Sequence, residues 1–219
     1  MLGAEAQYSN SPIAKYIQSF QNPKGEIFDL LISKKAVWHR SLYGVVNRDI
    51  NDFFGTQTRR AESRQSFAAL RALQCPPEYC YQLAPSTVDE VRKYVHSLNW
   101  KKPWNAGSHF SHMVFFLKSN DWRPRSKLAE SPSEKINELI NAAFSEISVY
   151  RQESGAWFQG GASPSTAEQV SGAMKIITAY MAAEKDRIGK EEKLIDLCLG
   201  LTINPDACHN FNLVLVLYY

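Results

Sequence analysis

The stretch Gln152-Glu-Ser-Gly-Ala-Trp-Phe-Gln-Gly-Gly-Ala-Ser-Pro-Ser-Thr-Ala-Glu-Gln-Val-Ser-Gly-Ala-Met-Lys-Ile-Ile-Thr-Ala-Tyr180 decides the fold of this chain. Its first part predicts the end of a helix and a Gly-rich corner that carries Trp157 and Phe158. The run from Ser163 to Thr166 then supplies hydroxyl groups for an N-cap and a proline near the first turn. A second helix is therefore expected over residues 165–182.

Helical periodicity recurs along the chain, whereas no alternating run of six or more residues predicts a strand. The expected helices fall into two sets, the first amphipathic and charge-rich, the second richer in small and apolar residues. The first set covers 88–98, 134–151 and 190–199; the second covers 59–73, 107–117, 165–182 and 206–219.

The second set begins at intervals of roughly 40 to 60 residues, a period typical of stacked αα-hairpins. We therefore expect an all-α fold in which stacked αα-hairpins form part of an α/α toroid. The apolar helices would form its inner layer and the amphipathic helices its outer layer. A plain helical solenoid is the alternative arrangement.

The domain organisation follows from the same pattern. Residues 1–58 predict two short helices, at 13–20 and 26–35, and a packed connection; residues 59–219 predict one domain of hairpin repeats. The last helix ends in an apolar run without a C-cap or a polar tail, so it is expected to lack an outer partner. We expect either a chain truncated at its C-terminus or a ring completed by another chain.

Composition narrows the class of protein. The 219 residues are 44% hydrophobic and 21% charged, and the net charge of +3 is too small to predict a nucleic-acid partner. No apolar run reaches the ~20 residues that span a bilayer, and the N-terminus does not resemble a signal peptide. The four cysteines are too sparse for a disulfide framework. These features predict a cytoplasmic protein with reduced thiols and no transmembrane segment.

One motif in the opening stretch carries a family resemblance. Gln152-Glu-Ser-Gly155-Ala-Trp157 resembles the Gln-x-x-Gly-x-Trp repeat motif of squalene and terpene cyclases. The Gly-Gly pair and the small-residue helix after it are similar to the matching corner of protein prenyltransferase β-subunits. The resemblance implies an α/α toroid in which such corners join outer to inner helices. Pro103-Trp-Asn-Ala-Gly107 resembles a degenerate copy around Trp104 that lacks the Gln.

The chemistry of this motif is structural. A Gln side chain can satisfy free backbone groups at a helix end, a glycine permits a tight turn, and a Trp covers the junction. The motif therefore bears on the fold and does not identify a reaction.

The resemblance also implies a metal site. Protein prenyltransferases hold zinc with an Asp-x-Cys at the start of an inner helix and a distant His, and Asp206-Ala-Cys208 fits that spacing. Asp206 and Cys208 are thus the expected zinc ligands, although the chain offers no counterpart for the His. Cys208-His209 is also similar to the Cys-His pair of lanthionine synthetase-like toroids, but Trp157-Phe158 lacks their corner cysteine. The Asp-x-Asp-Asp acid motif of class II terpene cyclases does not occur.

Three further residues are candidate catalytic groups. His109 and His112 lie three positions apart and share a helical face, as a metal pair or an acid/base couple would. Glu168 stands in a first turn, and with Asp206 it could form an acid pair for glycosidase or lyase chemistry. The structural alternatives are histidines bonded to backbone at a helix start and an acid that favours the helix dipole.

These residues lead to three hypotheses of function. The first is a prenyltransferase-like or terpene-cyclase-like enzyme whose central pocket takes an isoprenoid or a similar apolar substrate. The second is a non-catalytic scaffold or binding module with a protein partner, and the third is a carbohydrate-active toroid with a small-molecule or polymer substrate. Polar groups at successive helix starts favour an enzyme, and the missing signature acids favour a scaffold.

Overall fold

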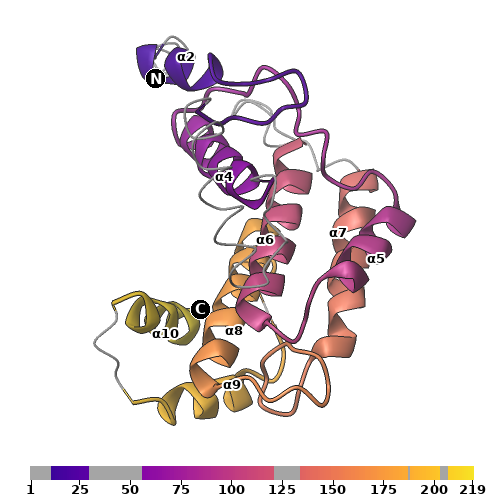
Figure 1. Ribbon diagram of the computed structural model, residues 1–219, viewed down its shortest axis with the longest axis vertical. Helices are drawn as coiled ribbons and strands as arrows, with labels where there is room; N and C mark the ends of the chain where they lie inside the picture. Colours follow the sequence, from indigo (N-terminus) through magenta and orange to yellow (C-terminus); the bar gives the residue numbers. More distant parts are fainter. Residues whose placement is uncertain (1–10, 30–55, 121–133, 187, 203–206) are drawn as a thin grey trace, which may run out of the picture. The chain divides into compact units, whose positions relative to one another are not determined.

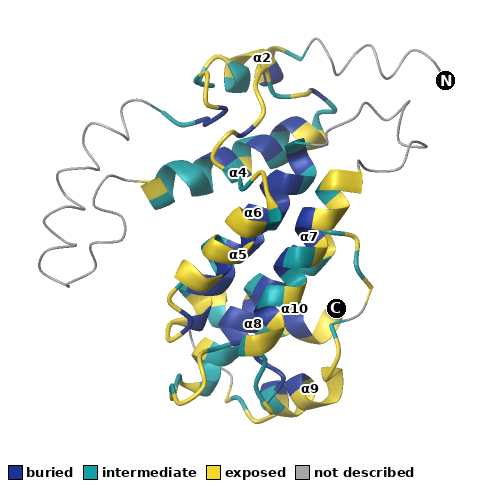
Figure 2. Ribbon diagram, turned by 90° about the vertical axis from the view of Figure 1, so that its right-hand side faces the viewer, coloured by how far each residue is buried: buried dark blue, intermediate teal, exposed yellow. Residues whose placement is uncertain are grey.

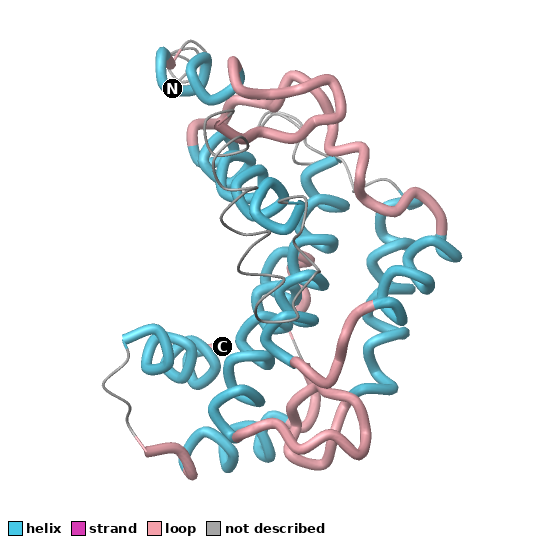
Figure 3. The backbone as a smooth tube through the Cα atoms, viewed as in Figure 1, coloured by secondary structure: helices cyan, strands magenta, loops and turns pink. Residues whose placement is uncertain are grey.

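The computed structural model describes residues 11–29, 56–120, 134–186, 188–202 and 207–219 (Figure 1). Within these ranges every regular element is a helix, which confirms the predicted all-α class (Figure 3). None of the helices described there combines the length and apolar character that crossing a bilayer requires. The chain divides into two compact units, residues 1–84 with 119–131, and residues 85–118 with 132–219.

The first unit contains α2 (Pro12–Gln18) and α4 (Thr56–Ala72). Its buried apolar residues are Ala14, Ile27, Phe67, Leu70, Cys75 and Tyr81. The buried Ser63 hydroxyl of α4 accepts a hydrogen bond from the Ile27 N–H at 2.9 Å. Phe67 meets Tyr81 edge to face, with ring centroids 6.4 Å apart. These contacts attach the segment after α2 and the segment after α4 to one helix.

The predicted helix over 26–35 is wrong at its start. Residues 26–29 are not helical, and Ile27 forms an isolated antiparallel bridge with Gln21. Two features turn the chain here: Gly25 has a φ of +82°, and the Asn22 Oδ1 accepts hydrogen bonds from the N–H groups of Lys24 and Glu26. Residues 30–35 lie outside the described residues.

The second unit contains most of the described helices. They are α5 (Val88–Ser97), α6 (Pro103–Asn120, whose last two residues belong to the first unit), α7 (Glu134–Ile147), the 3₁₀ turn η3 (Ser148–Tyr150), α8 (Thr166–Ala182), α9 (Glu191–Leu199) and α10 (Ala207–Tyr218). These bounds lie close to the predicted ones, except that α6 begins at Pro103 and not at residue 107.

Caps set the starts of α5 and α8, and the cap at α8 was expected from the run Ser163 to Thr166. The Thr87 hydroxyl accepts a hydrogen bond from the Glu90 N–H at 3.2 Å. At α8 the Ser165 hydroxyl accepts from the Glu168 N–H at 3.3 Å, and the Glu168 carboxylate accepts from the Ser165 N–H at 3.2 Å. This reciprocal pair is a capping box, which satisfies backbone donors that the helix leaves free.

Burial separates α6 and α8 from the amphipathic helices, but the expected inner-layer helix α4 does not follow this pattern, since it buries only Ser63, Phe67 and Leu70 (Figure 2). Five consecutive residues are buried in each of two helices, residues 113–117 in α6 and residues 170–174 in α8. The amphipathic α5 and α9 bury only single stripes, Val91 with Val95 and Leu194 with Cys198. The apolar α10 differs from α6 and α8, because Asn212 and Val216 are its only buried residues. It packs against α8 and α9.

The backbones of α6 and α8 meet at two glycines. A Cβ on Gly172 would lie 2.6 Å from the Pro103 Cβ, and one on Gly107 would lie 2.9 Å from the Gly172 carbonyl oxygen. Neither position has room for a side chain, since heavy atoms this close must move apart. Further along α6, Phe110 meets Phe144 of α7 edge to face at 5.5 Å. α6 therefore contacts both α8 and α7.

We predict that Gly172→Ala destabilises the protein. Alanine raises helix propensity by about 1 kcal/mol, but its Cβ would press on Pro103, and such overpacking costs about 1–3 kcal/mol. A net loss of up to about 2 kcal/mol in the free energy of unfolding is expected from urea titration. Gly160→Ala is the control, because a Cβ there meets nothing within 4 Å. Equal stability of the two variants would show that α6 and α8 do not meet at Gly172.

Candidate functional site

The corner predicted from Gln152 to Trp157 is closed by backbone and side-chain hydrogen bonds. Arg151 and Trp157 form an antiparallel bridge, the Gln152 N–H donates to the Ala156 carbonyl at 2.9 Å, and Gly155 has a φ of +81°. The Gln152 Nε2 donates to the Tyr150 carbonyl at 3.0 Å and to the Phe158 carbonyl at 2.8 Å. The Gln side chain therefore satisfies backbone groups beside η3, as the sequence predicted.

Arg151 fastens this corner to the chain that precedes α9. Its guanidinium carbon lies 3.8 Å from the centroid of the buried Trp157 ring. Its Nη1 donates to the Ile188 carbonyl at 2.8 Å, and its Nη2 donates to the Gly189 carbonyl. Burial lowers the pKa of Arg151 from its ordinary value. A Cβ on Gly155 would lie 2.9 Å from the Leu194 nitrogen, so α9 begins directly against the corner.

The first unit contains a second copy of this corner. In Gln21-Asn-Pro-Lys-Gly-Glu-Ile27 the Asn22 N–H donates to the Glu26 carbonyl and the Gly25 N–H to the Asn22 carbonyl, both at 2.9 Å. Gly155 makes the same bond to Gln152, at 3.1 Å. The glycine φ angles, +82° and +81°, agree as well. The two corners are an internal structural repeat, in which Asn22 and Ile27 stand at the positions of Gln152 and Trp157.

The copy expected around Trp104 is not a corner. Trp104 lies in the first turn of α6 with its side chain 52% exposed, and the Lys175 Nζ lies 5.6 Å from its ring centroid. The sequence signal for the true copy is the run Asn22-Pro-Lys-Gly25 between the expected helices 13–20 and 26–35.

The candidate catalytic residues occupy two different settings. His109 and His112 lie one turn apart in α6, both half-buried, and the His109 Nδ1 lies 3.4 Å from the Tyr94 hydroxyl of α5. Glu168 is exposed, and its carboxylate accepts hydrogen bonds from Ser165 in the capping box. The cap accounts for the position of Glu168 without any catalytic role.

Of the two expected zinc ligands, the structure describes Cys208 but not Asp206. Cys208 is an exposed cysteine in the first turn of α10, and Asp206 lies outside the described residues. In the described part of the chain, no three His, Cys, Asp or Glu side chains come together as a metal site would need. The described residues therefore do not form a zinc site by themselves, and Asp206 with Cys208 stays a prediction.

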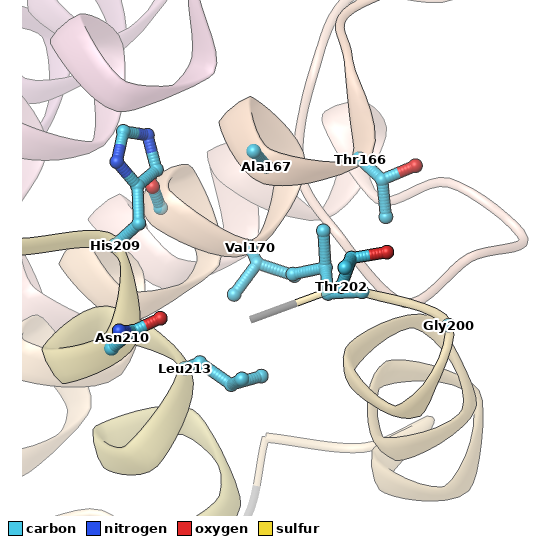
Figure 4. Close-up of a pocket in the computed structure, with 10 residues that line it drawn as sticks. Thr166, Ala167, Val170, Gly200, Thr202, His209, Asn210 and Leu213 are labelled. Atoms are coloured by element: carbon cyan, nitrogen blue, oxygen red, sulfur yellow. The ribbon is translucent and has the colours of Figure 1, made fainter. Parts of the chain in front are cut away.

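A pocket of about 260 Å³ lies between the first turns of α8 and α10 and the segment 200–202 (Figure 4). Val170 and Leu213 give it an apolar centre. Thr166, Thr202, His209 and Asn210 add hydroxyl, imidazole and amide groups around them. Among the described lining residues His209 is the one titratable side chain, and none carries a fixed charge.

The pocket lies beside two helix starts that carry candidate residues, but other residues of those turns line it. Glu168 and Cys208 are not among its lining residues, whereas Thr166, His209 and Asn210 are. The only signal for His209 in the sequence is indirect, because it is the neighbour of Cys208. Which residues of a first turn face inward depends on the helix rotation, and packing sets that rotation.

A polar cluster elsewhere in the second unit was not predicted. The His96 Nε2 lies 2.8 Å from the Glu146 Oε2, and the His96 Nδ1 lies 2.9 Å from the Tyr150 hydroxyl. The Arg92 Nε donates to the Glu146 Oε1 at 3.0 Å. The Tyr150 ring stacks on the buried Trp100 with centroids 4.5 Å apart. The cluster connects α5, α7 and η3, and its members lie about 50 positions apart in the sequence, beyond the reach of local patterns.

The comparisons with known proteins return no match. No family model, no curated protein and no solved structure matches the chain. The likeness to cyclases and prenyltransferases therefore rests on the corner residues alone.

We predict that Glu146 stabilises the protein in a pH-dependent way. Its hydrogen bond with His96, and then that with Arg92, holds the pKa of Glu146 below its ordinary value of 4.5. A carboxylate with a lowered pKa contributes stability above that ordinary value and loses it as the pH falls through the folded-state pKa. Glu146→Gln should therefore cost about 0.5–1 kcal/mol at pH 7, and the difference from the parent should shrink below about pH 4.

Urea titrations from neutral to acid pH measure this difference. Glu138→Gln is the matched control, since Glu138 is an exposed residue of the same helix. A deficit in Glu146→Gln that stays constant down to pH ~3 would contradict the assignment, because it would not follow the charge of the carboxylate.

Proposed function

We propose that the protein is an α/α-toroid-like helical domain that binds a small, largely apolar molecule with an oxygen-bearing head group. The pocket between the first turns of α8 and α10 is the proposed binding site. The observation that carries this proposal is its lining, in which an apolar centre is surrounded by uncharged hydrogen-bonding groups. Binding is the proposed activity, and no reaction is assigned to the site.

Two features support the toroid-like arrangement. The Gly25 and Gly155 corners repeat the same hydrogen bonds, and each follows a helical segment, as a joint between hairpins would. Well-buried apolar helices also alternate along the chain with amphipathic ones, from α5 to α9. An alternation of this kind is expected when hairpins stack with one helix inside and one outside.

The lining favours a neutral ligand. Val170 and Leu213 offer contacts to hydrocarbon, while Thr166, Thr202 and Asn210 offer neutral donors and acceptors. A multiply charged head group would be poorly matched, because no described lining residue carries a fixed opposite charge. The volume of about 260 Å³ is slightly below the ~300–1,000 Å³ typical of sites for drug-sized ligands. A short isoprenoid alcohol has the required combination of size and polarity.

The carbohydrate-active alternative finds less support at this pocket. Glycoside hydrolysis uses two carboxyl groups on either side of the bond that breaks. Neither Asp nor Glu occurs among the described lining residues. His209 would instead direct its imidazole to a single hydroxyl of the ligand.

We predict that geraniol, used as a probe, shifts the methyl NMR signals of Val170 and Leu213. Leu213→Trp should fill the pocket and weaken binding at least ~10-fold, a loss of about 1.4 kcal/mol. Leu83→Trp is the control, because Leu83 is 54% exposed and lies in the other unit. Maltose, a sugar probe, should leave the Val170 signal unchanged.

Two results would contradict the proposal. The first is geraniol binding that survives in Leu213→Trp, which would place the ligand elsewhere. The second is a Val170 shift caused by maltose and not by geraniol, which would favour the carbohydrate-active alternative.

A further inference from the structure

One face of α10 presents a row of apolar side chains to solvent. Phe211 and Val214 are each 63% exposed and Tyr218 is 87% exposed. With the exposed Ala207 they stand at intervals of four, three and four residues. The opposite side of the helix carries Asn212 and Val216, which are buried, and the Asn212 Nδ2 donates to the buried Ser171 hydroxyl of α8 at 3.1 Å. We call the exposed row the α10 seam.

The spacing of the seam is that of a helix pair. Apolar residues at alternating intervals of three and four form the line along which two helices interlock in a coiled coil. Scattered exposed apolar residues are common on protein surfaces, but a continuous line of them at this spacing is not expected from chance exposure.

We propose that the α10 seam pairs with the same seam of a second copy of this chain, with the two α10 helices antiparallel about a two-fold axis near Val214. This interface is independent of the pocket and of the function proposed for it.

The absence of charge on α10 argues for a second copy as the occupant. From Ala207 to Tyr219 the chain contains no Asp, Glu, Lys or Arg. Charges beside a seam select a different partner by complementarity, and here none is available to do so. A partner with a charged face would have to desolvate that charge without compensation. A membrane surface is also disfavoured, since helices that lie on membranes typically carry Lys or Arg on the polar face.

The seam is self-complementary in the antiparallel direction. Phe211 and Tyr218 lie about equally far from Val214, so a two-fold axis there places Phe211 of each copy beside Tyr218 of the other. An aromatic pair of this kind adds to the burial of apolar area. Antiparallel helices also bring opposite dipole ends together, whereas parallel helices bring like ends together. A two-fold contact closes on itself and stops at a dimer.

The expected dimer is weak. Each fully buried aromatic side chain contributes roughly 150–250 Å², so the two aromatic side chains of the seam would bury on the order of 300–500 Å² per copy. A standard stable interface buries about 800 Å² per partner. Two leucines beside the seam add apolar area: Leu217 of α10 is 44% exposed, and Leu199 of the neighbouring α9 is 72% exposed. A dimer that dissociates on dilution is therefore expected.

Analytical ultracentrifugation from about 5 to about 500 μM tests the proposal, a range over which a weak dimer changes its population. The parent chain should shift from monomer to dimer, and Val214→Glu should stay monomeric throughout. Val149→Glu is the matched control, because Val149 is 65% exposed outside the seam, and it should dimerise like the parent. Circular dichroism spectra of the parent and the two variants should agree, which shows that all three proteins are folded alike.

A second variant tests the register without a buried charge. In a background where the exposed Cys80 and Cys208 are replaced by Ser, Val214→Cys should form a disulfide-linked dimer on mild oxidation, and Val149→Cys should not. A parent chain that is monomeric at every concentration would overturn the proposal. So would a dimer that persists in Val214→Glu, or a monomer that binds neutral phosphatidylcholine vesicles through the seam.

Discussion

The corner between η3 and α8 is the constraint on which the second unit depends most directly. Its glycine adopts a left-handed conformation that other residues rarely reach, and Gln152 satisfies the backbone groups on both sides of the turn. Arg151 covers Trp157 and reaches the carbonyl groups that precede α9. This one short segment follows α7 and η3, precedes α8, and contacts the start of α9. The same turn in the first unit shows that the fold uses this device twice.

Local signals account for what the sequence predicted correctly. The starts of α5 and α8 follow from Thr87 and Ser165, which cap their helices by bonds to residues three positions away. The predicted role of Gln152 likewise concerned neighbours within six positions. The second corner was missed because Asn22 and Ile27 replace the Gln and the Trp, and the apolar residues after Gly25 also fit a helical spacing. A shared turn geometry does not require a shared side-chain signature.

Tertiary proximity accounts for what the sequence could not predict. His96 meets Glu146 and Tyr150 only because α5 packs against α7. The lining of the pocket beside α8 and α10 depends on how these helices are rotated, and it includes His209 but not the candidate residues Glu168 and Cys208. Glu168 acts in a cap, so a polar residue in a first turn is a weak sign of a site when a capping role is available. The absence of Asp and Glu among the described lining residues is the basis of the proposed binding of a small neutral molecule.

Amide hydrogen exchange measured by NMR tests most directly whether the two corners are closed by hydrogen bonds in solution. The N–H groups of Gln152, Phe158 and Asn22 donate to backbone carbonyls across the turns, so their exchange should be slowed on the order of 100-fold or more. The exposed tip residue Glu153 should exchange much faster. Exchange of Gln152 and Asn22 at the rate of Glu153 would contradict the account, because the two corners would then not be closed in solution.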